Sequence, residues 1–145
     1  MKVFIPHNHQ RCQVCSQGFF TDSAICFEAV GEHETLIKHE AVAKYKTRTK
    51  IVPTDKAEGY DGIMQGGIVT TLHDSVMLHC LFQNSIKAMT VSLTSRFHHP
   101  ILIGQELEVC AQWVKSRRNI YFLESQITQC GKLCSSAQSQ FMSSP

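Results

Sequence analysis

The chain has 145 residues and a formal net charge of +2, with 43% hydrophobic and 18% charged residues. This length supports one core but not two, and the scattered positive residues argue against nucleic acid as the main partner. The amino terminus lacks an apolar run of signal-peptide length and no later segment is long enough to span a membrane, so we expect a cytoplasmic protein with no membrane partner.

The chain begins with a segment, residues 1–20, that we expect to be loosely ordered ahead of one domain at 21–145. Within it His7, His9, Cys12 and Cys15 have residue types and spacing that can bind zinc. The seven cysteines are odd in number, which favours reduced thiols over a disulfide framework. Five of them are predicted to be small core residues: Cys26, Cys80, Cys110, Cys130 and Cys134.

Two strands are predicted in the first third of the chain. Residues 24–30 are rich in strand-forming residues, and a turn is expected at 31–34. Residues 44–52 have β-branched or aromatic residues between charges and end at Pro53, which is typical of an exposed strand near a sheet edge.

A glycine-rich loop then leads into a helix predicted at 67–82. Its helical period rests on Val69, Leu72, Val76 and Cys80, and the segment is apolar nearly all round. Asp74 lies inside this apolar run, where an unpaired carboxylate is costly and usually has a partner or a task. Gly66 and Gly67 let a ligand approach the backbone, and free N–H groups at a helix start stabilise an oxygen that gains negative charge. Together these features indicate acyl-transfer chemistry.

The rest of the chain predicts four strands joined by short connections, at 88–97, 106–115, 120–128 and 135–142. In the first, apolar residues alternate on one face, namely Met89, Val91, Leu93 and Phe97; the second shows the same alternation in Leu107, Val109, Ala111 and Trp113. We therefore expect an antiparallel meander that forms a curved sheet around the helix, an α+β fold.

This order resembles the hotdog-fold acyl-CoA thioesterases, most nearly those of the phenylacetate-degradation and 4-hydroxybenzoyl-CoA type. The resemblance rests on Gln65-Gly-Gly-Ile at the helix start, Asp74 in the helix, and residues 95–100 ahead of a turn at Gly104. It covers roughly residues 20–142. It implies a curved antiparallel sheet around one long central helix, an acyl-CoA substrate, and a homo-oligomer that is a dimer or a dimer of dimers.

The resemblance also implies roles for single residues. The Gly67 N–H would polarise the thioester carbonyl, and Asp74 would act as general base or nucleophile, a choice that the sequence leaves open. Seven residues of α-helix rise about 10 Å, so these two groups of one chain cannot both reach one carbonyl. Two copies of the helix related by a two-fold axis would bring Asp74 of one subunit to Gly67 of the other.

Further residues complete the predicted site. Gly66 and Gln65 join the catalytic set, although the family commonly has His at position 65, and a glutamine can orient a group but cannot titrate near neutrality. Predicted substrate-binding residues are Thr71, Ser75, Arg96, His98, Arg117 and Arg118. The hydroxyls of Thr71 and Ser75, and that of Thr70, would hydrogen-bond the Asp74 carboxylate or the attacking water, or would donate back to the helix backbone. The basic groups, with His99, would meet the coenzyme A phosphates or remain solvated surface charge. His73 and His79 are predicted to be packed structural groups.

Three other functions stay open beside the hydrolase. They are a hotdog-type acyl-CoA hydratase or dehydratase, which would move protons with a His and an acidic partner, a non-catalytic acyl-CoA-binding module, and a zinc-dependent interaction module. The resemblance implies that the amino-terminal Cys-x-x-Cys serves packing against the sheet or substrate tunnel. We therefore assign no metal, and no cofactor other than the coenzyme A of the substrate.

Overall fold

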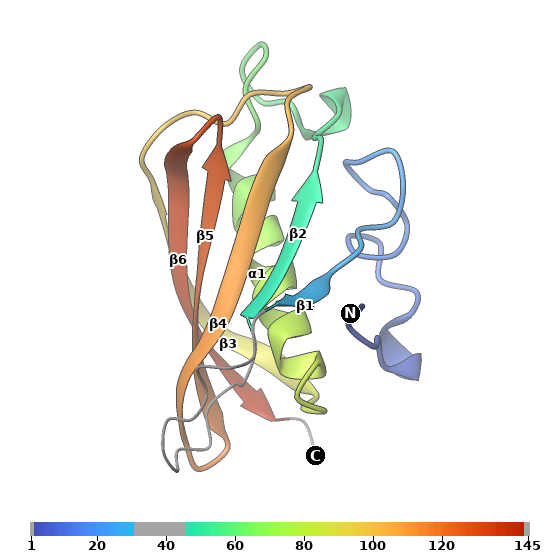
Figure 1. Ribbon diagram of the computed structural model, residues 1–145, viewed down its shortest axis with the longest axis vertical. Coiled ribbons are helices and arrows are strands. Elements are labelled where there is room, and N and C mark those ends of the chain that lie inside the picture. The colour runs from blue at the N-terminus through green and yellow to red at the C-terminus, as the bar shows by residue number, and fades with distance from the viewer. Residues whose placement is uncertain (1, 31–45, 144–145) are drawn as a thin grey trace.

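The computed structural model describes residues 2–30 and 46–143, and within them a curved antiparallel sheet packs against one long helix (Figure 1). The strands are β1 (Glu28–Val30), β2 (Lys46–Ile51), β3 (Ala88–Phe97), β4 (Leu107–Arg117), β5 (Ile120–Gln129) and β6 (Lys132–Ser143). The helices are α1 (Gly66–Phe82) and two short 3-10 turns, η1 (His7–His9) and η3 (Asp55–Ala57). The turn predicted at 31–34 lies outside the described residues.

The strands lie in the order β1-β2-β4-β5-β6-β3. The predicted meander is confirmed for β4, β5 and β6, but β3 is not a neighbour of β4; it pairs with β6, from Ala88 opposite Ser143 to Phe97 opposite Ser135. The connection 98–106 is too long for a tight hairpin, so nothing forces β4 to fold back on β3. As a result β3 forms an edge of the sheet beside α1.

The central helix has the predicted character and starts one residue earlier than predicted. The Gln65 side chain caps it by accepting a hydrogen bond from the Ile68 N–H at 3.0 Å. Its buried side chains come from nearly all sides of the helix, including Leu72, Val76, Met77 and Leu81, each fully buried. Because the curved sheet covers most of the helix, a polar group on α1 needs a hydrogen-bond partner or a route to solvent.

The predicted apolar face of β3 is wrong. The register shifts between Thr90 and Ser92, so a bulge at Val91 moves the side chains beyond it to the opposite face. Leu93 packs against the core, whereas Met89, Val91 and Phe97 are 65%, 53% and 56% exposed. Met89 and Val91 are therefore exposed apolar side chains beside the unpaired backbone groups of this edge strand, while Phe97 lies beside Gly66 at the start of α1.

The amino-terminal residues lie alongside β1 and β2 (Figure 1) and contribute side chains to the core. Val3, Cys15 and Phe20 are 9%, 2% and 0% exposed, and the Val3 N–H donates to the Phe27 carbonyl at 3.0 Å. The division into a loosely ordered segment 1–20 and one domain 21–145 stays a prediction.

All seven cysteines are free thiols. Cys80 and Cys134 are buried and Cys110 is half-buried. The prediction of core positions is wrong for Cys26 and Cys130, which are exposed. Cys26 alternates with the buried Ile25 and Phe27, so its side chain points outward, and Cys130 lies in the β5–β6 turn with a left-handed φ of 54°.

Candidate functional site

The loop before α1 is fixed by main-chain hydrogen bonds. The Gln65 N–H donates to the Ala57 carbonyl and the Met64 N–H donates to the Ile101 carbonyl, both at 2.8 Å. A Cβ added at Gly59 would lie 3.0 Å from the Cα of Gln65, so the backbone of this loop lies too close for a larger residue. The start of the helix is therefore held in one position before any ligand arrives.

The first two amides of α1 face solvent. Gly66 and Gly67 are exposed, and no acceptor among the described residues takes their N–H groups. The Gln65 side chain lies over Gly67, because a Cβ there would come within 2.9 Å of Gln65 Oε1. Since Oε1 accepts from Ile68, the Nε2 group of Gln65 is left as a donor. Two backbone amides and one side-chain amide are thus available to an incoming oxygen.

A hollow of about 380 Å³ opens at this helix start. Gly66 and Val69 form its helical side, and Phe97, His98 and His99 from the end of β3 form the opposite side. His98 is exposed and its Nε2 lies 3.0 Å from the Ser136 hydroxyl, while Arg96 is exposed on β3. The structure therefore brings Gly66 together with His98, two residues that the sequence assigns to one site.

Asp74 lies two turns further along the helix and is half-buried. Its Oδ1 accepts a hydrogen bond from the Thr90 hydroxyl of β3 at 2.6 Å. Burial raises the pKa of the Asp74 carboxyl above its ordinary value of 3.8, while the hydrogen bond from Thr90 and the nearby His9 lower it. A carboxylate with a raised pKa and one oxygen positioned by a neutral donor is well suited to accept a proton.

The hydroxyls near Asp74 have other partners. The Thr71 hydroxyl donates back to the Gly67 carbonyl at 2.9 Å, and Thr70 donates to Ser95 at 3.1 Å. Ser75 is 6% exposed, and its side chain lowers the pKa of the nearby Cys15 thiol, which burial raises overall. Among the predicted helpers, Thr71 therefore bonds back to the helix and Ser75 faces the amino-terminal segment, while Thr90, which the sequence did not single out, holds the carboxylate.

The two helix histidines are packed structural groups, as predicted. His73 is fully buried, with Nδ1 and Nε2 at 2.6 and 2.7 Å from the hydroxyls of Ser125 and Ser135. His79 is also fully buried and stacks on Phe27. Burial lowers the pKa of each imidazole from 6.5 to about 4, so both are neutral at pH 7.

Arg117 and Arg118 lie at the far end of the sheet from the helix start. They border a second hollow of about 340 Å³ at the β4–β5 hairpin. The neighbouring Asn119 carbonyl accepts from the Ser143 N–H at 3.0 Å, and Ser143 pairs with Ala88 at the start of β3. Arg96 and His98 instead lie at the end of β3, a strand of ten residues that spans about 30 Å. One chain therefore does not bring the predicted basic residues together.

Solved structures similar to this chain include thioesterase superfamily proteins. No protein-family model matches the sequence, and no curated protein matches it at a significant level. One thioesterase superfamily protein is 19% identical with a TM-score of 0.69, and the match covers 82% of this chain and 56% of that one. The fold is the hotdog fold. This chain thus spans little more than half the length of that relative.

Two further solved structures are similar to this chain. A Streptococcus mutans protein bound to acetyl-CoA is 16% identical, with a TM-score of 0.67 over 81% of this chain and 88% of that one. A phenylacetic acid degradation-related protein of Ralstonia eutropha, a proposed thioesterase, is 24% identical, with a TM-score of 0.62 over 67% and 75%. No helix in the described part of this hotdog chain is long and apolar enough to cross a membrane.

Proposed function

We propose that this protein is an acyl-CoA thioesterase that uses Asp74 as the reacting carboxylate and the Gly67 amide as the oxyanion donor. One observation carries the proposal. A half-buried carboxylate with a raised pKa lies on the same helix as two solvent-facing amides. The acetyl-CoA bound to the Streptococcus mutans structure supports the choice of substrate class.

The reaction needs a base, hydrogen-bond donors that stabilise the negative carbonyl oxygen, and a leaving group. In the base form of the mechanism, Asp74 removes a proton from water, whose oxygen attacks the thioester carbon. The carbonyl oxygen becomes negative and accepts hydrogen bonds from the Gly67 N–H and Gln65 Nε2. The carbon–sulfur bond then breaks, and the coenzyme A thiolate takes the proton that Asp74 holds. Alternatively, Asp74 attacks the carbon itself, and the carbon–sulfur bond breaks to release the coenzyme A thiolate, which takes a proton from solvent. Water then hydrolyses the resulting mixed anhydride to the carboxylic acid and the free Asp74 carboxylate.

A single chain does not complete this site. Gly67 and Asp74 are seven residues apart on α1, a rise of about 10 Å, which is too far for both groups to contact one carbonyl. We propose that β3 pairs antiparallel with β3 of a second copy. This pairing would bury Met89 and Val91, which are 65% and 53% exposed, and would place Thr90 and Asp74 of one subunit beside the helix start of the other.

The same pairing gathers the basic residues. The start of β3 in one subunit would meet the end of β3 in the other, which brings the hairpin of Arg117 and Arg118 toward Arg96 and His98 of the second copy. Clustered arginines are suited to bind phosphate groups by charge-assisted hydrogen bonds. We propose that the coenzyme A phosphates lie there, at the surface between the two subunits.

The test is hydrolysis of short, medium, long and aromatic acyl-CoAs, measured through the freed thiol. Asp74→Asn keeps the size of the side chain and an oxygen for the Thr90 hydroxyl, and it is expected to lower kcat by about 10²–10⁴-fold. Asp22→Asn, at an exposed carboxylate just after the amino-terminal segment, is the matched control and should retain wild-type turnover. Wild-type turnover by Asp74→Asn, or no turnover of any acyl-CoA by the wild type, would contradict the proposal.

A further inference from the structure

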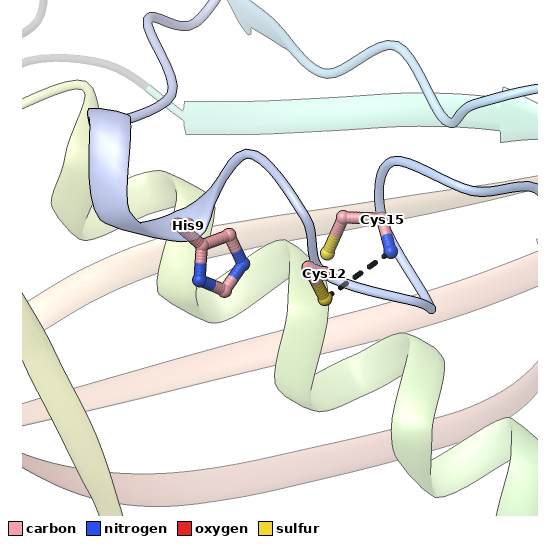
Figure 2. A group of neighbouring side chains, drawn as sticks. All are labelled: His9, Cys12 and Cys15. Atoms are coloured by element: carbon pink, nitrogen blue, oxygen red, sulfur yellow. Dashed lines mark hydrogen bonds between the residues drawn. The ribbon is translucent and has the colours of Figure 1, made fainter.

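The amino-terminal segment brings together three side chains of the kinds that bind zinc. His9 ends η1, and Cys12 and Cys15 follow in the next turns, over α1 (Figure 2). One ligand atom from each residue lies within 4.8 Å of the other two. His7, on the same short helix, is exposed and is not part of this group. The structure therefore selects three of the four residues that the sequence spacing offers.

The backbone already holds the two sulfurs of this cluster. The Cys15 N–H donates to the Cys12 sulfur at 3.4 Å, the dashed line in Figure 2, and the Ser16 N–H donates to the Cys12 carbonyl at 3.0 Å. An amide that points at a sulfur stabilises negative charge there, which is the form in which cysteine binds a metal. The turn thus supplies a hydrogen-bond donor to the Cys12 sulfur.

The cluster also contains a buried polar atom without a partner. His9 Nε2 is buried and makes no hydrogen bond with the described residues. An unpaired buried imidazole nitrogen is costly, and so is a thiolate at Cys15, which is 2% exposed. One divalent cation would offset both costs, because two thiolates and a neutral imidazole around Zn²⁺ have no net charge.

The distances allow such a centre. Zinc bonds of about 2.3 Å to sulfur and 2.0–2.1 Å to nitrogen in a tetrahedron put neighbouring ligand atoms about 3.5–3.8 Å apart. Ligand atoms within 4.8 Å of one another need to close by about 1 Å, a movement within reach of side chains on a turn.

We propose that His9, Cys12 and Cys15 bind one zinc ion, which fixes the conformation of the amino-terminal turn that lies over α1 (Figure 2). The fourth position would hold water. The His79 ring lies 5.8 Å from the His9 ring, and its Nδ1 donates to the Ser75 carbonyl at 2.8 Å, so its buried, unpartnered Nε2 can only accept. A zinc-bound water is a donor suited to that nitrogen. This proposal does not depend on the thioesterase activity.

The experiment is metal analysis and Co²⁺ titration of the full chain, purified under reducing conditions and supplied with zinc. We expect one zinc per chain in the wild type. The zinc content should be lower by about tenfold or more in His9→Ala, Cys12→Ser and Cys15→Ser. Matched controls are His7→Ala on the same short helix and Cys26→Ser and Cys130→Ser at exposed thiols, and all three should retain the metal.

Cobalt makes the result independent of whether a cysteine variant folds. The wild type should saturate with one equivalent of Co²⁺ and show thiolate-to-cobalt charge-transfer absorption, which zinc should abolish on displacement. Wild-type protein that retains neither metal when supplied with it would overturn the proposal. So would equal loss of metal in the control variants.

Discussion

Acidification is expected to destabilise this protein strongly through its buried histidines, and His73→Gln is expected to weaken that pH dependence. His73 is fully buried between two serine hydroxyls, and burial lowers its pKa from 6.5 to about 4. A group with a lowered pKa in the folded state binds fewer protons there than in the unfolded chain. Its contribution to stability is therefore fully present above pH 6.5 and is lost as the pH falls toward 4.

The size of the effect follows from this displacement. A fall in pKa from 6.5 to about 4, at about 1.4 kcal/mol for each pKa unit, corresponds to roughly 3 kcal/mol for His73 below pH 4 and about 2 kcal/mol at pH 5. Burial lowers the pKa of His79 from 6.5 to about 4 as well, so this residue adds a similar amount. Together they represent a large part of the 5–15 kcal/mol of a typical domain, as an order of magnitude.

The assay is urea unfolding of wild type and His73→Gln from pH 7.5 to 4.5. Glutamine cannot titrate in this range but can hydrogen-bond one of the two serines, so the variant should be less stable at pH 7.5 by about 1 kcal/mol. Below pH 6.5 the free energy of unfolding of the variant should fall less steeply than that of the wild type. The difference in slope should be up to about 1.4 kcal/mol per pH unit, which is what one titrating proton contributes. Parallel curves for the two proteins would show that His73 does not cause the loss of stability in acid.

Two further predictions concern the helix start and the carboxylate. Asp74→Asn should raise the free energy of unfolding at pH 7. Because the pKa of Asp74 is raised in the folded state, this carboxyl contributes its full stability below pH 3.8, and the contribution is lost as the pH rises through the folded-state pKa. Urea titration at pH 7 and pH 4 should therefore show a smaller gain in stability for the variant at the lower pH. Gly67→Ala should displace the Gln65 cap, lower stability by about 1 kcal/mol and reduce turnover, whereas Gly66→Ala, whose Cβ would meet Phe97 at an ordinary 3.8 Å, should fold with wild-type stability by thermal unfolding. Equal stability losses in the two alanine variants would contradict this account of the cap.

Much of the fold could be predicted because local patterns determine it. The helical period of α1 and the alternation of Leu107, Val109 and Ala111 in β4 depend only on which side chains face the core. The position of β3 could not be predicted in the same way, because strand order depends on where the 98–106 connection runs. The bulge at Val91 was also hidden, since the sequence around it alternates without interruption.

The candidate site was predictable as residue types and only in part as contacts. Gly67 and Asp74 could be singled out because their residue types are unusual at a helix start and in an apolar helix. The Thr90 hydroxyl could not, because threonine is common in strands and its bond to Asp74 spans 16 residues that fold back on themselves. In the amino-terminal motif, the sequence spacing does not show whether His7 or His9 lies beside the two cysteines. The conformation of η1 decides this, because it places His9 next to Cys12 and Cys15.

Mixed dimers distinguish a thioesterase site shared between two subunits from a site built within one chain. Asp74→Asn and Gly67→Val, a change that displaces Gln65 and covers the amide, should each be inactive alone. When the two variants are co-expressed with different affinity tags and the mixed dimer is purified, one of its two sites combines an intact Gly67 with an intact Asp74 from the other subunit. We expect about half of the wild-type acyl-CoA hydrolysis per dimer. A mixed dimer as inactive as its parents would contradict the shared site.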